Sequence, residues 1–193
     1  MNILERAKGI ILKPKEEWEK IGQETNNSTV ILTTYLIPLA LISAVASLIG
    51  YGLIGYGSFS TFSFGIKHAI IMLISIIGGA YLTAFIIDLL APSFNAEKNF
   101  GRAFALVVYS YTPMMVAGVL YIFPVLGVIV LLASLYGLYI LYLGMKPMMK
   151  SPDDKVTIYF IVSLIVLIVV YFVLSYLLSS IFIGSVVRAT AGF

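Results

Sequence analysis

The chain has 193 residues, of which 61% are hydrophobic and 11% are charged, and its formal net charge is +3. A soluble domain keeps about a quarter of its residues charged, so this composition excludes a water-soluble globule and indicates an integral membrane protein. The excess positive charge is spread over several segments, which excludes a nucleic-acid-binding face, and the absence of cysteine excludes disulfides, thiol catalysis and cysteine-ligated metal.

Residues 1–24 are predicted to form a cytoplasmic segment of amphipathic helices. The apolar face of the first helix consists of Ile3, Leu4, Ala7, Ile10 and Ile11. Glu5, Arg6 and Lys8 are expected on the opposite face. Pro14 ends this helix and begins a second short helix, which carries Trp18. Such a segment either packs beneath the membrane domain and on lipid headgroups or docks a protein partner, and the sequence leaves both interpretations open.

Residues 25–193 are predicted to form a single transmembrane domain. A helix needs about 20 apolar residues to cross a hydrocarbon core of about 30 Å. Five stretches meet this requirement, near residues 29–53, 67–90, 103–122, 125–145 and 157–183. A glycine-rich loop over residues 51–65 joins the first two spans, and Phe123 with Pro124 marks a tight return between the third and fourth. The predicted fold is an all-α integral membrane protein with five transmembrane helices and an N-terminal amphipathic segment.

The distribution of lysine and arginine predicts the orientation in the membrane. One side carries ten of them, in the N-terminal segment and in the loops around residues 98–102 and 146–155. The other side carries only Lys67 and Arg188. Because cytoplasmic loops are enriched in these residues, we expect a cytoplasmic N-terminus and an external C-terminus.

Three short motifs follow one another along the chain. They are Pro14-x-x-x-Trp18-x-x-Ile21 ahead of the spans, glycines within the second span, and Tyr109-Ser-Tyr-Thr-Pro113 in the third. This arrangement resembles the Yip (Ypt-interacting protein) family, in its bacterial inner-membrane branch. The resemblance implies a multi-pass protein of the inner (cytoplasmic) membrane with the same orientation as the charge distribution predicts.

The resemblance does not extend to GTPase binding. Eukaryotic members of the family are associated with prenylated small GTPases and vesicle traffic, and they carry an Asp-Leu-Tyr-Gly-Pro signature in their cytoplasmic region. That signature is missing here. Asp88-Leu-Leu-Ala-Pro92 is similar to it only superficially and lies after the second span.

Four of the five spans carry a helix-weakening residue at a similar depth, namely Pro38, Gly78 with Gly79, Pro113, and Gly137. A proline inside a helix lacks the N–H that the carbonyl four residues earlier would accept, so Pro113 frees the carbonyl of Tyr109. Helix breaks of this kind line binding sites in transporters. Small residues also allow helices to pack closely, and this alternative stays open.

Tyrosine is unusually frequent, with 13 copies. Six of them lie deep within predicted spans, namely Tyr35, Tyr81, Tyr109, Tyr111, Tyr136 and Tyr171. A hydroxyl that faces lipid is costly, so we expect these side chains to point into the bundle and to bind groups such as the freed carbonyls. They would then form either a hydrogen-bonded core or a polar-lined groove.

Asp88 is the only acidic residue within a predicted span. We expect it near the cytoplasmic face, paired with Lys98 or Arg102, and a proton or cation site is the alternative. His68 has no second ligand of comparable quality, so no metal site is predicted. General acid–base catalysis needs paired titratable groups, which the spans lack, and the sequence therefore predicts neither an enzyme nor a cofactor.

The sequence favours a non-enzymatic membrane-organising or interaction protein of the Yip type. Its expected partners are membrane lipids and a protein at the cytoplasmic N-terminus, and homo-oligomer formation stays open. The alternative is a transporter, a channel or a lipid-moving protein with a polar groove in the middle of the membrane. The candidate residues for these roles are Trp18, Pro38, Gly78, Gly79, Asp88, Tyr109, Tyr111, Pro113 and Tyr136.

Overall fold

The computed structural model describes residues 2–54 and 62–191, with side chains up to residue 173, and all regular structure in these ranges is helical. Five of the described helical segments are long and apolar enough to cross a membrane, namely Ser28–Ile54, Phe62–Phe94, Phe100–Ile122, Pro124–Met149 and Val156–Val173. The prediction of an all-α protein with five spans is confirmed. The predicted loop after the first span is shorter than expected because helix continues to Ile54 and resumes at Phe62, and its residues 55–61 lie outside the described residues.

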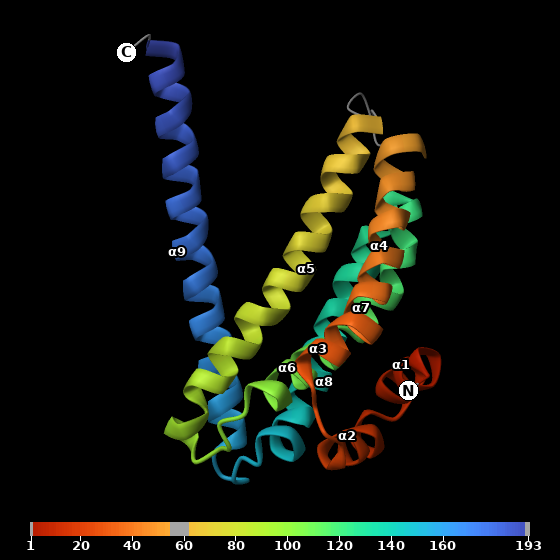
Figure 1. Cartoon of the computed structure of the whole chain (residues 1–193), viewed down its shortest axis with the longest axis vertical. Coiled ribbons are helices and arrows are strands. Elements are labelled where there is room, and N and C mark those ends of the chain that lie inside the picture. Colours follow the sequence, from red (N-terminus) through yellow and green to blue (C-terminus); the bar gives the residue numbers. More distant parts are fainter. Residues whose placement is uncertain (1, 55–61, 192–193) are drawn as a thin grey trace.

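Two short helices precede the spans. The first, α1 (Ile3–Leu12), begins after Asn2, whose side chain accepts a hydrogen bond from the backbone N–H of Leu4, and the second, α2 (Pro14–Gln23), begins at its proline. They pack against each other and against the spans, so we call residues 3–23 the N-terminal hairpin. Figure 1 shows both helices in red beside the lower half of the bundle. Their predicted position at a cytoplasmic membrane surface stays a prediction.

The first span contains two wide helical turns. After α3 (Ser28–Ile31), the backbone forms a π-helical turn over Leu32–Leu36, continues as α4 (Ile37–Ile49) and ends in a second π-helical turn over Gly50–Ile54. Pro38 lies in the first turn of α4 and cannot donate a backbone hydrogen bond. The π-helical turn directly before it is the kind of local distortion that such a residue produces in a span.

The remaining spans follow as α5 (Phe62–Leu90) with a 3-10 turn over Ala91–Phe94, α6 (Phe100–Ser110), α7 (Thr112–Ala117), 3-10 turns over Gly118–Ile122 and Pro124–Leu126, α8 (Gly127–Met149) and α9 (Val156–Ala191). Phe123 separates the two 3-10 turns in an extended conformation, with φ −112° and ψ 96°. The tight return predicted between the third and fourth spans is therefore confirmed.

The third span lies at the centre of the bundle. Every residue from Ala103 to Ser110 is at most 2% exposed, and Val116 and Val119 further along the span are exposed, so its first half is the part that the bundle encloses. The first turns of α9 contact α5 and α8, because the hydroxyl of Tyr159 donates to the carbonyl of Ile87 in α5 and the ring of Phe160 packs against that of Tyr142 in α8. Figure 1 shows α9 in blue, close to α5 at the lower end and far from it at the upper end. We call the lower end, where Glu97, Arg102 and Lys150 lie, the basal end.

Candidate functional site

Trp18 connects the N-terminal hairpin to the centre of the bundle. Its side chain is 1% exposed, and its Nε1–H donates a 3.0 Å hydrogen bond to the carbonyl of Ile140 in α8. Gly144, one turn further along α8, leaves the space that the indole occupies. A Cβ atom at this glycine would lie 2.6 Å from Cε2 of Trp18 and 2.5 Å from Cδ1 of Leu106. The indole of Trp18 therefore has space only because Gly144 has no side chain.

An ionic cluster of Arg6, Glu17 and Glu24 connects the two helices of the hairpin. Nη1 of Arg6 lies 2.7 Å from Oε1 of Glu17, and Nη2 lies 2.5 Å from Oε1 of Glu24. The guanidinium also lies over the ring of Tyr109, with Cζ 5.6 Å from the ring centroid. Burial by itself lowers the pKa of Arg6, but the hydrogen bond and negative charge of Glu24, together with Glu17, raise it above its usual value. The cluster thus holds a permanent positive charge between two carboxylates.

The position of Arg6 corrects the sequence prediction, which placed it on the exposed face with Glu5 and Lys8. The side chain of Arg6 is 8% exposed, while Leu4, which was predicted on the buried face, is 77% exposed. At 100° per residue, Arg6 lies next to Ile10 on the helical wheel, so an arginine shares the buried face. The two glutamates of α2 and of the segment after it make this burial possible.

Tyr136 and Arg102 satisfy carbonyl groups at helix ends. The hydroxyl of Tyr136 donates a 2.8 Å hydrogen bond to the carbonyl of Ile11, in the last turn of α1. Arg102 donates to the carbonyls of Met148 in α8 and Gly22 in α2, over 3.3 Å and 3.5 Å. A cation near the C-terminal end of a helix is favourable because the carbonyls there carry partial negative charge.

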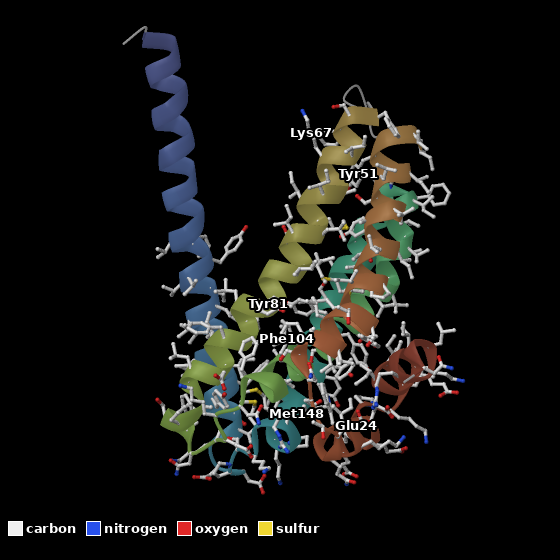
Figure 2. All side chains as sticks on the ribbon, in the orientation of Figure 1. Glu24, Tyr51, Lys67, Tyr81, Phe104 and Met148 are labelled. Atoms are coloured by element: carbon white, nitrogen blue, oxygen red, sulfur yellow. The ribbon has the colours of Figure 1, made fainter. Side chains whose placement is uncertain are left out.

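Tyr109 joins these contacts to the first span. Its ring lies edge-on to Trp18 at 6.3 Å and to Tyr35 at 4.9 Å between centroids, and its side chain is 2% exposed. We call these contacts of the hairpin with the spans the hairpin-docking site. It contains the predicted residues Trp18, Tyr109 and Tyr136 together with Arg6, Glu17, Ile140 and Gly144. Figure 2 labels Glu24, which follows α2, beside the spans in this region.

A second group of predicted residues lies at the break between α6 and α7. The carbonyl of Tyr109, which Pro113 frees, accepts a 2.6 Å hydrogen bond from the hydroxyl of Thr112. Oγ1 of Thr112 is also 2.9 Å from the hydroxyl of Tyr35. A tyrosine hydroxyl was predicted to bind this carbonyl directly. Instead, the threonine next to the proline provides the hydrogen bond and connects the carbonyl to the tyrosine.

A cavity of about 390 Å³ lies beside this helix break. Its walls come from α5, from the α6–α7 segment and from α8, and consist of Met72, Ser75, Ile76, Ser110, Tyr111, Met114, Ser134, Leu135, Gly137, Leu138 and Leu141. Tyr111 is the predicted residue that lines it, and its hydroxyl is 3.3 Å from Oγ1 of Thr83 in α5. Tyr109 and Asp88 do not line this cavity.

The glycines at this level have different surroundings. A Cβ atom at Gly137 would lie 2.7 Å from the carbonyl oxygen of Ser110, so α8 and the end of α6 are in close contact there. At Gly79, the same atom would lie 3.6 Å from the hydroxyl of Tyr111. Gly78 has nothing within 4 Å and faces away from the bundle. Gly79 therefore lies at the candidate site, and Gly78 does not.

Two of the six deep tyrosines depart from the prediction that they point inward. Tyr81 is 37% exposed and packs its ring on Phe104 at the surface of α5, and Tyr171 is 67% exposed. The prediction was wrong for Tyr171 because this part of α9 has diverged from the other spans. Tyr35 and Tyr109 are buried, and Tyr111 and Tyr136 are half-buried.

Asp88 is 9% exposed, and in the described part of the chain it forms no ion pair. Its Oδ1 atom also has no hydrogen-bond partner among the described residues. The expected pair with Lys98 or Arg102 is therefore absent, because Arg102 donates to backbone carbonyls at the basal end instead. The hydroxyl of Tyr159 donates a hydrogen bond to the carbonyl of Ile87, the residue before Asp88. Asp88 is thus separate from the other candidate residues.

Four contributors to the hairpin-docking site were not predicted from the sequence, namely Arg6, Glu17, Ile140 and Gly144. Arg6 could have been found from its position beside Ile10 on the helical wheel. Gly144 is one of many glycines, and no local signal distinguishes it. Glu17 belongs to α2 and Arg6 to α1, so their ion pair depends on how the two helices pack. Within the described side chains, no group of three or more His, Asp or Glu residues comes together as a metal site.

Five described helical segments that are long and apolar enough to cross a membrane define a multi-pass integral membrane protein. A family model described as the Yip1 domain matches residues 8–177. The chain belongs to the Yip1 domain family. A search of curated proteins and a search of solved structures each find no significant match.

Proposed function

We propose that the chain is a non-catalytic membrane-organising protein of the bacterial inner membrane, and that its N-terminal hairpin contacts the lipids of the cytoplasmic leaflet and a protein partner there. The observation that supports this role is the hairpin-docking site. It fixes α1 at the side of the bundle with one face buried, and it leaves large apolar residues on the outward face. In this proposal the N-terminus is cytoplasmic and the C-terminus is external.

The depth of the hairpin favours contact with lipid. Lys146, in the last turn of α8, is the first charged residue along the fourth span, and Ile140 precedes it by six residues, which corresponds to about 9 Å along a helix. Tyr136 precedes it by ten residues, or about 15 Å. Trp18 and Ile11 bind at these two levels. An interfacial helix buries its apolar face about 5–10 Å into the boundary between headgroups and acyl chains. The level at which Trp18 of α2 binds lies in this range, and the end of α1 at Ile11 binds deeper.

The exposed surface of α1 has the composition of such a helix. Leu4 is 77% exposed and Leu12 is 66% exposed, and Lys8 lies between them on the same side. Glu5 is exposed as well, so the surface combines apolar contact area with charges that reach water. A protein partner would meet the same surface or the outward face of α2.

The test uses the fact that the chain contains no cysteine. Leu4→Cys and Leu12→Cys are labelled separately with an environment-sensitive fluorophore and reconstituted into phosphatidylcholine vesicles that carry bromine at defined acyl positions. We expect bromine near the headgroup to quench both labels. Glu19→Cys, on the exposed face of α2, is the matched control and should be quenched less. Equal quenching at all three positions, or none at Leu4 and Leu12, contradicts the proposal.

The orientation is tested in whole cells. Lys13 lies at the junction of the two hairpin helices, and Lys67 lies at the opposite end of the bundle, where Figure 2 labels it. A membrane-impermeant maleimide should label Lys67→Cys in intact cells and should label Lys13→Cys only after the cells are broken. The reverse pattern places the N-terminus outside and contradicts the proposed orientation.

Movement of a solute receives less support from the geometry than an interaction role does. A polar pathway was expected to expose Tyr109, Tyr111 and Asp88, and of these Tyr111 lines the cavity beside the helix break, while Tyr109 and Asp88 do not. Flux measurements in sealed vesicles, with ions, solutes and fluorescent lipids, separate the two roles. Transport that Pro113→Ala or Asp88→Asn abolishes would favour the alternative.

A further inference from the structure

We propose that the cavity beside the helix break binds one acyl chain of a membrane phospholipid. This inference is independent of the proposed role of the N-terminal hairpin, since none of the hairpin residues lines the cavity. All the lining residues belong to spans that are apolar enough to cross a membrane. The ligand would therefore come from the hydrocarbon region of the bilayer, which the cavity faces.

The cavity is open toward the lipid-facing surface of the bundle. Ser75 in α5 and Leu135 and Leu138 in α8 line it and are also exposed on the outside of their helices. Tyr111 and Ser110 form the inner wall at the helix break. A chain in the surrounding bilayer can enter sideways without crossing a polar region, so the cavity is continuous with the surface that lipid already covers.

The size of the cavity fits a chain and excludes a helix. The volume of about 390 Å³ corresponds to roughly 13 groups of about 30 Å³, the volume of a water molecule in the liquid, and a methylene group is of similar size. A helix with its side chains is about 10–12 Å wide, so this volume would hold only about one turn. A transmembrane helix from a partner or from a second copy therefore does not fit inside.

The chemistry of the walls also favours an apolar occupant. None of the lining residues is charged. The hydroxyl of Ser110 donates to the carbonyl of Leu106 over 2.7 Å, and that of Ser134 donates to the carbonyl of Val130 over 2.9 Å. Because these hydroxyls bind their own helices, they do not need a hydrogen bond from the ligand. A charged headgroup has no partner here and would stay at the membrane surface.

Two contacts hold the walls in place and distinguish this cavity from an ordinary lipid-facing groove. Gly137 lies against the carbonyl of Ser110, which fixes α8 to the inner wall. The hydroxyl of Tyr111 lies 3.3 Å from Oγ1 of Thr83, which connects the inner wall to α5. A chain between these walls is enclosed on three sides, so it should exchange more slowly than the lipids around the protein.

The test is photolabelling of the reconstituted full chain. The vesicles consist of phosphatidylcholine with a small share of phosphatidylcholine that carries a diazirine in the middle of one acyl chain, and labelled positions are mapped by mass spectrometry. We expect label to concentrate on Met72, Met114 and Leu138 relative to Ile74 and Leu132, which are exposed outside the cavity. Equal labelling of cavity residues and outside residues would overturn the proposal.

Filling variants test the same site from both walls. Ser75→Phe should abolish the preference for cavity residues, while Ile74→Phe, which faces lipid next to it, should leave the preference unchanged. Ser134→Phe and its control Leu132→Phe repeat the comparison from α8, in case one wall tolerates the change poorly. Unchanged cavity labelling in both filling variants contradicts the proposal. Labelling by a diazirine fatty acid but not by the phosphatidylcholine probe overturns the assignment to a phospholipid.

Discussion

Replacement of Trp18 by alanine should release the N-terminal hairpin without unfolding the spans. The indole is 1% exposed, and removing a buried aromatic side chain costs about 3–5 kcal/mol. The hydrogen bond to the carbonyl of Ile140 adds about 1 kcal/mol. The sum, about 5 kcal/mol, corresponds to between three and four powers of ten in the population of the undocked hairpin, since each 1.4 kcal/mol is about a factor of ten. Trp18→Phe keeps most of the ring and should cost about 1 kcal/mol, close to one power of ten.

Amide hydrogen exchange measures this population directly. In reconstituted protein, the amides of residues 3–23 should exchange faster in Trp18→Ala by up to the same factor, while those of α6 and α8 change little. Gly144→Ala disturbs the contact from the opposite side. Its Cβ would lie 2.6 Å from the indole, and overpacking of this kind costs about 1–3 kcal/mol. Gly78→Ala, where nothing lies within 4 Å, is the matched control and should leave hairpin exchange unchanged.

The docking role of Trp18 is contradicted if the hairpin keeps its protection in both Trp18→Ala and Gly144→Ala. It is also contradicted if Gly78→Ala accelerates exchange in the hairpin as much as Gly144→Ala does, because the effect would then come from glycine replacement in a span and not from the docking site. A uniform loss of protection across all spans would show that Trp18 stabilises the whole bundle rather than the hairpin.

Arg6→Met leaves the buried carboxylate of Glu17 without its main partner and should destabilise the protein by about 3–5 kcal/mol in thermal unfolding, while the double variant with Glu17→Met should recover a large part of the loss. Thr112→Val removes the hydroxyl that donates a hydrogen bond to the freed carbonyl of Tyr109, and should lower the stability by about 1–3 kcal/mol in the same assay. The hydrogen bond from Lys150 lowers the pKa of Glu97, so its stabilisation is present above the usual carboxyl pKa of about 4.3 and is lost as the pH falls through the lowered value. Because this pair is solvent-exposed, Glu97→Gln should cost less than about 1 kcal/mol at neutral pH and should remove that acid dependence, and an unchanged stability–pH curve in the variant would contradict the assignment.

The transmembrane spans could be predicted from the sequence because hydrocarbon requires long apolar helices whatever their packing. The same reasoning located the return at Phe123 and the carbonyl that Pro113 frees. It could not decide which side of a helix faces the bundle, since in a membrane both sides are apolar. Tyr171 was therefore predicted to be buried, although the part of α9 that carries it has no helix beside it.

The hairpin-docking site was predictable only in part. Trp18 is the single tryptophan of the chain, which made it a candidate. Its partner Ile140 is 122 residues away. Because Ile140 accepts the hydrogen bond with its backbone carbonyl, its side chain gives no sign of the contact. Arg6 and Glu17 belong to different helices, and their pairing follows from how these helices pack. Asp88 was expected to pair with a nearby cation, and the basal end instead uses Arg102 to bind carbonyl groups.

The long sequence separation between Trp18 and Ile140 has a consequence for synthesis. A ribosome adds about 5–20 residues per second, so the carbonyl that receives the indole is made roughly 6–24 seconds after the tryptophan. Throughout that interval the emerging N-terminal region lacks the surface that later encloses it, and it is open to targeting factors and proteases. Nascent chains that stall before the fourth span should therefore be degraded from their N-terminal end faster than chains that stall after it.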